Sequence, residues 1–343
     1  MVAHIALTRV AASPQAILNG VAVYPEGRIF SSFPRWMDAP TSSLGEAQRD
    51  GSFEAFPGGS WHEWQPGLSP AEHFVNVHSI YADAENYLWA VDDAAPRHQP
   101  HLKGGPKLVK IDLRTNQIVR VFAMDESVAP QGAVLGHMRV LGRHAFVTES
   151  HYGAIIVLDQ ETGATRRLLS RDAKTRADPS IVPVIDGKEF RRADGRVQVV
   201  NVNLLELSPD GSWLYFTCLF GPVLRRIATR HLLDPALDDE ALSPLIEDVA
   251  RIPPCAGITA DKKGRLYFSS FTQNAMLMME PGGKPEMLVS DPRLSFPNEP
   301  DIGPDGALYV PGSQIHRLPG FQADGKSRVV APWEVLKIEI SGR

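Results

Sequence analysis

Residues 203–217, NLLELSPDGSWLYFT, join an apolar run to an aromatic run through a turn that ends at Gly211. The same outline returns as AGITADKKGRLYFSS from Ala256 and as NEPDIGPDGALYVPG from Asn298. In each copy the turn glycine stands eight positions after the first residue. A unit that recurs in a fixed register predicts a repeat architecture.

Three further copies are visible in the first half of the chain. NGVAVYPEGRIFSSF begins at Asn19, HSIYADAENYLWAVDD at His78, and HMRVLGRHAFVTESH, whose turn is shorter, at His137. In the second of these, Asn86 stands where other copies have glycine, and Asn tolerates the left-handed backbone conformation. Six copies therefore begin near positions 19, 78, 137, 203, 256 and 298.

Several copies are followed by a further pair of strands. Residues 107–122, 154–169 and 275–289 show period-two alternation on both sides of a turn, which is typical of antiparallel hairpins. Helical periodicity is scarce, and only 229–249 is predicted to be partly helical, as a decoration of a loop. Four short strands repeated six times predict an all-β protein, a single six-bladed β-propeller domain over residues 1–343.

The two ends of the sequence predict how the propeller closes. The last copy lacks an obvious fourth strand after 333–340, whereas residues 4–12 precede the first copy without a partner. We therefore expect the N-terminal strand to complete the last blade, which would also cover two strand edges that favour aggregation when exposed.

Composition narrows the functional class. The 343 residues are 43% hydrophobic and 22% charged, with a net charge of −5, as in ordinary soluble proteins. The chain lacks the basic character of nucleic-acid-binding proteins and any apolar run of the roughly 18 residues that span a membrane. The first residues do not resemble a secretory signal, and two cysteines cannot build a disulfide framework. We expect a cytoplasmic protein with a small-molecule partner, no nucleic acid and no membrane; the oligomeric state stays open.

The chain also resembles a known family. The matching segments are FVNVHSIYADAENYLWAVDD, GGPKLVKIDLRTNQIVRVF, HYGAIIVLDQETGATRRLL, LELSPDGSWLYFTCLFGPVLRRI, GRLYFSSFTQNAM and DPRLSFPNEPDIGPDGALYVPGSQIHRLPGF, within residues 75–340, with a weaker match in 17–57. They resemble the major royal jelly protein/Yellow family, in particular its bacterial members, and more distantly the gluconolactonase and strictosidine-synthase propellers. The resemblance implies a six-bladed propeller with its site at the tunnel mouth. Because family members include both dopachrome-converting enzymes and nutritional or ligand-binding proteins, it implies no single reaction.

Departures from the family pattern concern the tunnel mouth. Bacterial members often carry Asp at the start of the innermost strand, where this chain has His78, His137, Asn203, Ala256 and Asn298. Glu149 replaces an Asp that commonly follows the second strand of the third blade. Only Glu299 supplies a displaced carboxylate, which weakens the expectation of a family-like Ca²⁺ site.

The candidate site follows from the repeats, because equivalent positions of all blades converge on one axis. The residues predicted around the tunnel mouth are Asn19, His78, His137, Asn203, Ala256 and Asn298, with Ser79, Cys255 and Glu299 alongside. The predicted catalytic group is His137 as proton carrier, Asn203 and Asn298 as holders of a carbonyl or oxyanion, and Glu299. His78 is the second candidate for proton transfer. Alternatively, these polar side chains only satisfy backbone groups at strand starts.

Predicted substrate-binding residues extend around this ring. They are Asn19, His78, Ser79, Glu149, His151, Cys255 and Trp36. Glu149 and His151 lie in TESHYG (148–153), which suits either acid–base chemistry or a hydrogen-bonded turn. Trp36 ends SSFPRW (31–36), which, with SWHEWQPG (60–67), either covers the tunnel mouth or packs on its rim. A nucleophilic role for Cys255 would need a base and an electropositive setting.

Metal binding is left open by the ring. His78, His137 and Glu299 are transition-metal ligand types, while Asn19, Asn203, Asn298 and Glu299 would suit Ca²⁺. Yet the sequence has no HxH or HExxH pair and only one ring carboxylate. We expect no cofactor, with a divalent metal as the less favoured alternative.

Three functional hypotheses follow. The first is a cofactor-independent enzyme, a lactonase-like hydrolase or an isomerase, acting on a small polar cyclic metabolite by lactone hydrolysis, isomerisation or tautomerisation. The second is a non-catalytic ligand-binding propeller of the royal jelly protein type. The third is a protein-interaction platform.

Overall fold

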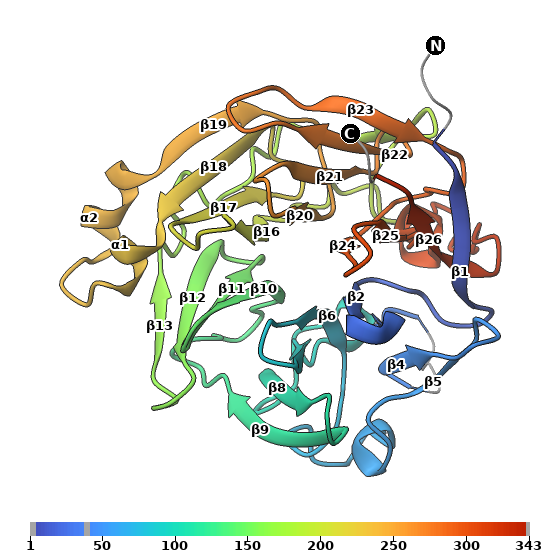
Figure 1. Ribbon diagram of the computed structural model, residues 1–343, viewed down its shortest axis with the longest axis horizontal. Coiled ribbons are helices and arrows are strands. Elements are labelled where there is room, and N and C mark those ends of the chain that lie inside the picture. Colours follow the sequence, from blue (N-terminus) through green and yellow to red (C-terminus); the bar gives the residue numbers. More distant parts are fainter. Residues whose placement is uncertain (1–4, 38–41, 341–343) are drawn as a thin grey trace.

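The computed structural model, which describes residues 5–37 and 42–340, contains six four-stranded antiparallel sheets around a central axis (Figure 1). This arrangement confirms the predicted all-β six-bladed propeller. The strands of the first three blades are β2 (Val21–Tyr24), β3 (Arg28–Ser32), β4 (Leu44–Ala47) and β5 (Phe53–Ala55); β6 (Val77–Ala82), β7 (Tyr87–Asp92), β8 (Lys107–Asp112) and β9 (Gln117–Ala123); and β10 (Leu135–Leu141), β11 (His144–Glu149), β12 (Ala154–Asp159) and β13 (Thr165–Leu168).

The second half of the propeller repeats this pattern. Its blades are β16 (Val202–Leu207), β17 (Trp213–Cys218), β18 (Val223–Ala228) and β19 (Glu247–Arg251); β20 (Ile258–Ala260), β21 (Leu266–Ser270), β22 (Ala275–Met279) and β23 (Glu286–Ser290); and β24 (Asp301–Ile302), β25 (Leu308–Pro311), β26 (Trp333–Ile338) and β1 (Leu7–Ser13). A small extra hairpin, β14 (Val184–Ile185) with β15 (Lys188–Glu189), lies in the long connection between blades three and four.

The first strand of each blade lines the axis. Strands β2, β6, β10, β16, β20 and β24 contact one another in that order, and β24 contacts β2 to complete the ring. The turn that follows each inner strand explains the recurring sequence register. The predicted glycines of four copies have φ values between 69° and 82°, and Asn86 takes their place with φ 71°.

The N-terminal strand closes the ring as predicted. β1 pairs antiparallel with β26, from Leu7 opposite Ile338 to Ser13 opposite Trp333, and so forms the outer strand of blade six. The backbone N–H of Ala12 also donates to the Gly51 carbonyl, 2.8 Å away, which links this strand to blade one.

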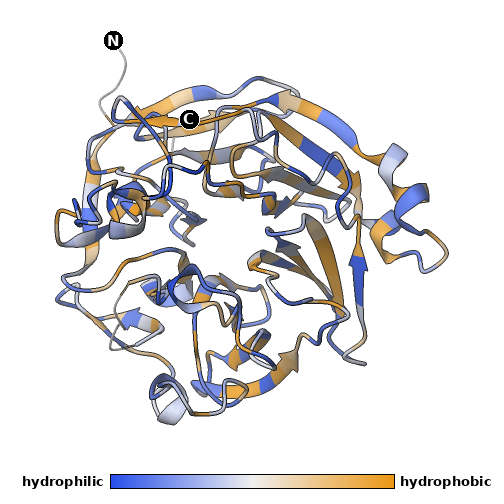
Figure 2. Cartoon of the chain, turned by 180° about the vertical axis from the view of Figure 1, so that it is seen from behind, coloured by the Kyte–Doolittle hydropathy of each residue, from blue (hydrophilic) through white to orange (hydrophobic). Residues whose placement is uncertain are grey.

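The hydrophobic core is divided into layers between neighbouring blades. Apolar side chains of facing sheets form these layers, and Trp89 and Tyr267 are completely buried in two of them. Figure 2 shows the apolar residues distributed through the strands of all blades. Each blade thus depends on its neighbours for its apolar contacts.

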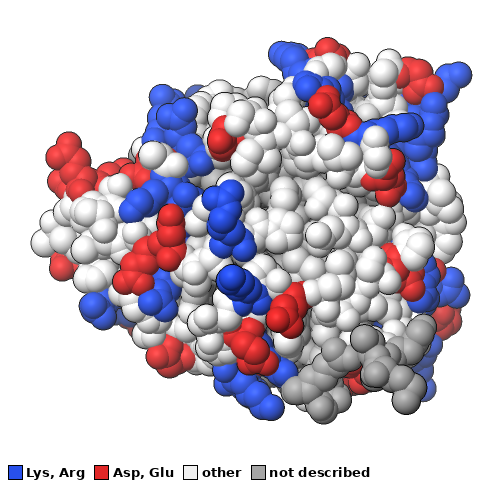
Figure 3. Space-filling model, turned by 90° about the horizontal axis from the view of Figure 1, so that it is seen from above, with Lys and Arg blue, Asp and Glu red and all other residues white. Residues whose placement is uncertain are grey.

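Helices are few and peripheral. α1 (Thr229–Leu233) and α2 (Asp239–Leu242) decorate the connection between β18 and β19, as expected for 229–249. The 3₁₀ turns are η1 (Pro25–Gly27), η2 (Ser60–His62), η3 (Pro96–His98), η4 (Ser243–Leu245), η5 (Ile315–Arg317) and η6 (Pro319–Phe321). In the part of the chain that the structure describes, no helix has the length and apolarity needed to cross a bilayer. Figure 3 shows Lys and Arg side chains lying close to Asp and Glu on one face of the molecule.

Candidate functional site

A cavity of about 280 Å³ lies at one mouth of the central tunnel. Its floor is formed by His78 of β6, Asn203 of β16 and Asn298, which precedes β24. Its walls come from connections between strands, including those after the second strands of blades one, two, three and six and those before blades four and six. The principal wall residues are Trp36, Asp93, Ala95, His98, Ser150, His151, Phe190, Arg192, Val199, Phe296, Ile315 and Phe321.

Three inner strands, two of which carry residues of the cavity floor, pair irregularly with their neighbours near their first residues. The β6–β7 register shifts between Val77 and Ser79, and the β16–β17 register shifts between Val202 and Leu204, which brackets His78 and Asn203 respectively. The β10–β11 register shifts between Leu135 and Met138 in the same way. Such bulges re-aim side chains and free backbone groups from the ladder. The repeated position therefore differs locally from a regular strand.

His78 on the floor of the cavity and Asp93 on its wall form a pair. Nδ1 of His78 lies 3.3 Å from Oδ2 of Asp93. Oδ1 of Asp93 accepts hydrogen bonds from Asn76 Nδ2 at 2.7 Å and from the Ala95 N–H at 2.9 Å, which hold the carboxylate in place. The rings of Trp36 and His78 meet in a T-shaped arrangement, with their centroids 5.5 Å apart. This arrangement orients one imidazole nitrogen toward a carboxylate and leaves the ring on the cavity surface.

The three asparagines of the ring have different surroundings. Asn19 donates from Nδ2 to the His78 carbonyl at 2.7 Å and accepts a hydrogen bond from Asn298 Nδ2. Asn19 is fully buried and does not line the cavity, so it satisfies a backbone group in the way the alternative interpretation expected. The Oδ1 atom of Asn203 is buried without a hydrogen-bond partner among the described residues. Asn203 and Asn298 thus present amide groups to the cavity, and Asn19 supports them.

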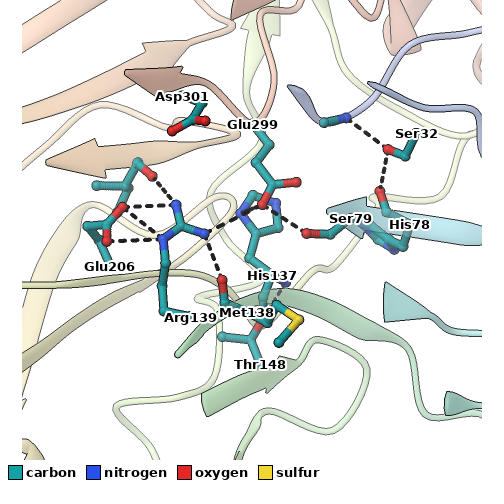
Figure 4. A network of polar contacts seen from close by, with 12 residues as sticks. Ser32, His78, Ser79, His137, Met138, Arg139, Thr148, Glu206, Glu299 and Asp301 are labelled. Atoms are coloured by element: carbon teal, nitrogen blue, oxygen red, sulfur yellow. Dashed lines mark hydrogen bonds and ion pairs between the residues drawn. The ribbon is translucent and has the colours of Figure 1, made fainter. Parts of the chain in front are cut away.

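A buried polar group, here called the tunnel cluster, lies among the inner strands (Figure 4). It consists of Ser79, His137, Arg139, Glu206 and Glu299. Ser79 Oγ donates to Glu299 Oε1 at 2.8 Å, and the same oxygen lies 3.5 Å from His137 Nδ1 and 3.7 Å from Arg139 Nη1. Arg139 Nε also donates to both oxygens of Glu206, at 3.0 and 2.9 Å. One arginine therefore joins two carboxylates at the centre of the propeller.

Burial moves the pKa values in this cluster. It raises the pKa of Glu299 to about 7, although the nearby Arg139 cation and the Ser79 hydrogen bond oppose the shift. Burial also holds the pKa of His137 well below its usual value, and the neighbouring His78 and Arg139 act in the same direction. Asp301, beside this cluster in Figure 4, has a pKa raised by burial to about 6.

His137 differs from the sequence-based expectation. As the predicted proton carrier it should reach the cavity, all the more because the shortened turn of its repeat would leave more open space at the rim. Its side chain, however, has no exposed surface and does not line the cavity. Both imidazole nitrogens lack hydrogen bonds within the described chain, although Nδ1 lies near Glu299. Glu299 is likewise 1% exposed. Both residues, together with Ser79, lie in the tunnel cluster, away from the cavity wall.

The outer candidates separate into two groups. Trp36 and His151 line the cavity, so residues 31–36 end as part of its wall. Glu149 is buried: it accepts hydrogen bonds from the N–H groups of His151 and Tyr152 and pairs with Arg167 at 2.6 Å, which makes it the centre of a hydrogen-bonded turn.

Cys255 and Ala256 lie outside the cavity as well. Both are buried, and Cys255 belongs to an apolar cluster between blades. Burial raises the pKa of the Cys255 thiol, which opposes formation of a thiolate.

Metal-ligand side chains are sparse among the described residues of the tunnel. Within residues 5–37 and 42–340, no three His, Cys, Asp or Glu side chains gather as a metal-ligand set. Glu299, the one ring carboxylate, already faces the Arg139 guanidinium. Asn19 and Asn298 use their side chains on each other. A cationic side chain thus stands beside the only acidic ring position.

Asp93, Arg139, Glu206 and Arg192 were missed by sequence reasoning. Arg139 had a usable signal, because it lies two positions after His137 and strand side chains two apart share a face. Asp93 belongs to the segment VDD (91–93), whose aspartates are equally typical of a strand end and turn and so gave no specific signal. Arg192 lies in a long connection without periodicity, so no pattern indicated its position.

Comparisons with known proteins agree with this fold. The sequence profile described as Major royal jelly protein matches residues 75–300. Among curated proteins, none matches the chain. A gluconolactonase from Xanthomonas campestris has 12% identity and a TM-score of 0.59 over 98% of this chain and 91% of that chain. A luciferin-regenerating enzyme has 12% identity and a TM-score of 0.58 over 99% and 96%. A streptogramin B lyase has 12% identity and a TM-score of 0.54 over 98% and 97%.

Proposed function

The chain belongs to the major royal jelly protein family, and from this premise we propose that it is a small-molecule enzyme that transfers protons to and from a cyclic substrate in the tunnel-mouth cavity. The observation that carries the proposal is the His78–Asp93 pair that lines the cavity, with Nδ1 and Oδ2 3.3 Å apart. A carboxylate that holds one imidazole nitrogen leaves the other available as a general base or acid.

The same groups support lactone hydrolysis, in which the proton taken from water is later returned to the leaving group. His78 Nε2 takes a proton from a water molecule as that water attacks the lactone carbonyl. The Asn203 amide donates a hydrogen bond to the oxyanion that forms. The ring C–O bond then breaks, and the His78 imidazolium returns its proton to the departing alkoxide, which gives a hydroxy acid. Asp93 positions the imidazole and stabilises its positive charge in between.

Isomerisation or tautomerisation needs fewer steps at the same residues. His78 removes a proton from the carbon next to a carbonyl, and Asn203 stabilises the enolate oxygen. The proton then returns to a different atom of the substrate. We assign the proton to His78 instead of His137, because His137 has no surface in the cavity.

The first prediction tests this assignment. We expect the wild-type protein to turn over members of a panel of five- and six-membered lactones and enolisable cyclic ketones. His78→Gln and Asp93→Asn should lower kcat/KM, the former by about 10²–10⁴-fold, because general acid–base catalysis typically contributes that much. Turnover is measured by pH-stat for lactones and by solvent deuterium exchange for ketones, with melting curves to verify folding.

A matched histidine variant provides the control. His231→Gln changes a side chain of α1, at the rim of the molecule, and should leave turnover unchanged. Wild-type rates in His78→Gln would remove His78 from the mechanism.

A ligand-binding protein is the second candidate, and the apolar wall of the cavity supports it. Aromatic rings from five connections line this wall and favour retention of a ligand whether or not it reacts. This function would show as ligand-induced stabilisation of the wild-type protein and of His78→Gln to the same extent, with no turnover in either.

A further inference from the structure

The cavity wall consists largely of aromatic rings. Trp36 and His98 stack with ring centroids 5.1 Å apart and an interplanar angle of 22°. Phe321 meets His98 in a T-shaped arrangement with ring centroids 6.0 Å apart, and it stacks on Phe190 with centroids 4.7 Å apart and an interplanar angle of 27°. Phe190 in turn contacts Phe296 at 5.7 Å. These five rings form a continuous series around the cavity, and flat ring faces of this kind favour planar ligands.

Arg192 brings a positive charge to this wall that has no partner among the described residues. Arg192 lines the cavity, and within residues 5–37 and 42–340 its side chain forms no ion pair or hydrogen bond. The nearby Asp194 is already paired with Arg196, through Nε at 2.7 Å. An unpaired guanidinium at a cavity wall is suited to bind a carboxylate or another anionic group through two parallel hydrogen bonds.

The backbone around Arg192 fixes where this charge is presented. Arg192 N–H donates to the Arg196 carbonyl at 2.9 Å, and Arg191 and Val197 form an antiparallel bridge, which together make a tight hairpin. The next residue, Ala193, donates to the Gly320 carbonyl at 2.8 Å. This contact ties the hairpin to the segment that carries Phe321, so the cation and the aromatic wall are held together.

The other charge on the wall is already used. Asp93 is the acidic residue of the lining, and its oxygens are bound by Asn76, by the Ala95 N–H and by His78. An anionic ligand group therefore has Arg192 as its attractive partner on the cavity wall.

We propose that the cavity selects planar, conjugated rings that carry an anionic group, with the ring against the aromatic wall and the anion at Arg192. Arg192 is thereby a specificity-determining residue. The proposal rests on the proposed function, because it concerns the same cavity. It also changes the expected ligand from a small polar metabolite to a flat and largely apolar one. The remaining polar substituent, a carbonyl or ring oxygen, then lies toward Asn203, Asn298 and His78.

Two probes that differ in charge test this selection. 2-Naphthoate and 2-naphthamide have nearly the same shape, but only the first is anionic. Binding to the wild-type protein is measured by quenching of tryptophan fluorescence and by calorimetry. We expect 2-naphthoate to bind about tenfold or more tightly than the amide, because hydrogen bonds to charged groups are the stronger ones. Cyclohexanecarboxylate, which has the charge without the flat ring, should bind more weakly than 2-naphthoate.

Variants then separate the two contributions. Arg192→Gln should lower the affinity for 2-naphthoate about tenfold and leave that for 2-naphthamide unchanged, so that the two probes bind alike. Trp36→Leu should weaken both. The matched control is Arg196→Gln, in the same hairpin but outside the cavity lining, which should preserve the preference for the acid. Equal wild-type affinities, absent binding of both probes, or an equal loss of both in Arg192→Gln would each overturn the proposal.

The binding readout is independent of catalysis. If His78→Gln binds 2-naphthoate as the wild type does and no substrate of the panel is turned over, the ligand class stands and the enzymatic function fails. If turnover is found but depends on neither Arg192 nor an anionic group, the enzymatic function stands and this inference fails.

Discussion

Glu299 and His137 lie next to each other in the tunnel cluster, 3.5 Å apart, and burial disfavours the charged form of both. For a carboxyl group this raises the pKa, here from 4.5 to about 7, whereas for an imidazole it lowers the pKa from 6.5. The two groups thus tend toward neutrality together near pH 7. Their contributions to stability, however, depend on pH in opposite directions.

Linkage gives the sign for each residue. Folded Glu299 keeps its proton up to about pH 7, whereas the unfolded chain loses it near 4.5, so this stabilisation is complete below 4.5 and is lost as the pH rises through 7. Folded His137 stays neutral, whereas the unfolded chain takes up a proton below 6.5, so its stabilisation is present above 6.5 and is lost as the pH falls.

Opposite pH profiles are therefore expected for two variants. The Tm of Glu299→Gln minus that of the wild type should increase steadily as the pH is raised from 5 to 8, because the variant lacks the carboxyl group whose ionisation destabilises the folded wild type at high pH. The Tm of His137→Gln minus that of the wild type should increase as the pH is lowered from 7 to 5. Calorimetric melting across this range measures both. Parallel curves for wild type and variants would contradict the assigned pKa directions.

At the level of single elements, β1 is the strand that closes the ring. It completes blade six along β26 and contacts blade one through Ala12. Deleting residues 1–12 removes most of this strand, so we expect Tm to fall on the order of 10 °C, as several kcal/mol of pairing and burial are lost in a chain of this size. Size-exclusion chromatography should also show association through the exposed edges.

A shorter deletion is the matched control. Removing residues 1–6 leaves β1, which begins at Leu7, intact, and should change Tm little. If both deletions melt alike, β1 does not contribute the closure that its pairing indicates.

The elements also show which parts of the structure were readable from sequence. The inner strands and hairpins repeat with a turn register that is fixed in five of the six copies, so positions such as Gly211 and Asn86 located their blades, and the shortened copy at His137 was found between them. The bulges around His78 and Asn203 could not be recognised in the sequence. A single extra residue hardly changes the composition of a strand, so no periodic pattern marks its position. The register therefore predicted that these positions converge, but it did not predict which of them reach the cavity and which, like His137, turn into the tunnel.

At the scale of the whole molecule, the tunnel cluster joins blades that are distant in sequence. Arg139 comes from blade three, Glu206 from blade four, Ser79 from blade two, and Glu299 from the start of blade six. The Arg139 guanidinium also lies over the ring of Tyr81 in blade two, 4.9 Å from its centroid. A single buried cation thereby neutralises carboxylates of two blades and contacts a third. The positive charge that links the inner strands of these blades is therefore the Arg139 side chain.

This role predicts how the protein responds to loss of Arg139. In Arg139→Met, Glu206 and Glu299 remain buried without a counter-charge, which costs about 3–5 kcal/mol when one partner of a buried pair is removed. In a chain of this size such a loss lowers Tm on the order of 10 °C. Because the uncompensated charges are carboxylates, lowering the pH from 8 to 5 should restore part of the lost stability, and added CaCl₂ should do the same at pH 8. The wild-type Tm should change with neither CaCl₂ nor EDTA, since Arg139 already supplies the positive charge.

An exposed arginine of the same blade separates this effect from a general loss of charge. Arg143 pairs with Asp159 and Glu161 at the surface, where ion pairs contribute little, so Arg143→Met should melt close to wild type. Two results would argue against a central role for Arg139: a wild-type Tm that falls on addition of EDTA, which would place a metal where we place the guanidinium, or an Arg139→Met variant that melts like Arg143→Met at pH 8. Either way, the comparison at pH 8 and pH 5 distinguishes a buried charge from a packing defect, because a methionine that merely packs poorly gains nothing from protonation of its neighbours.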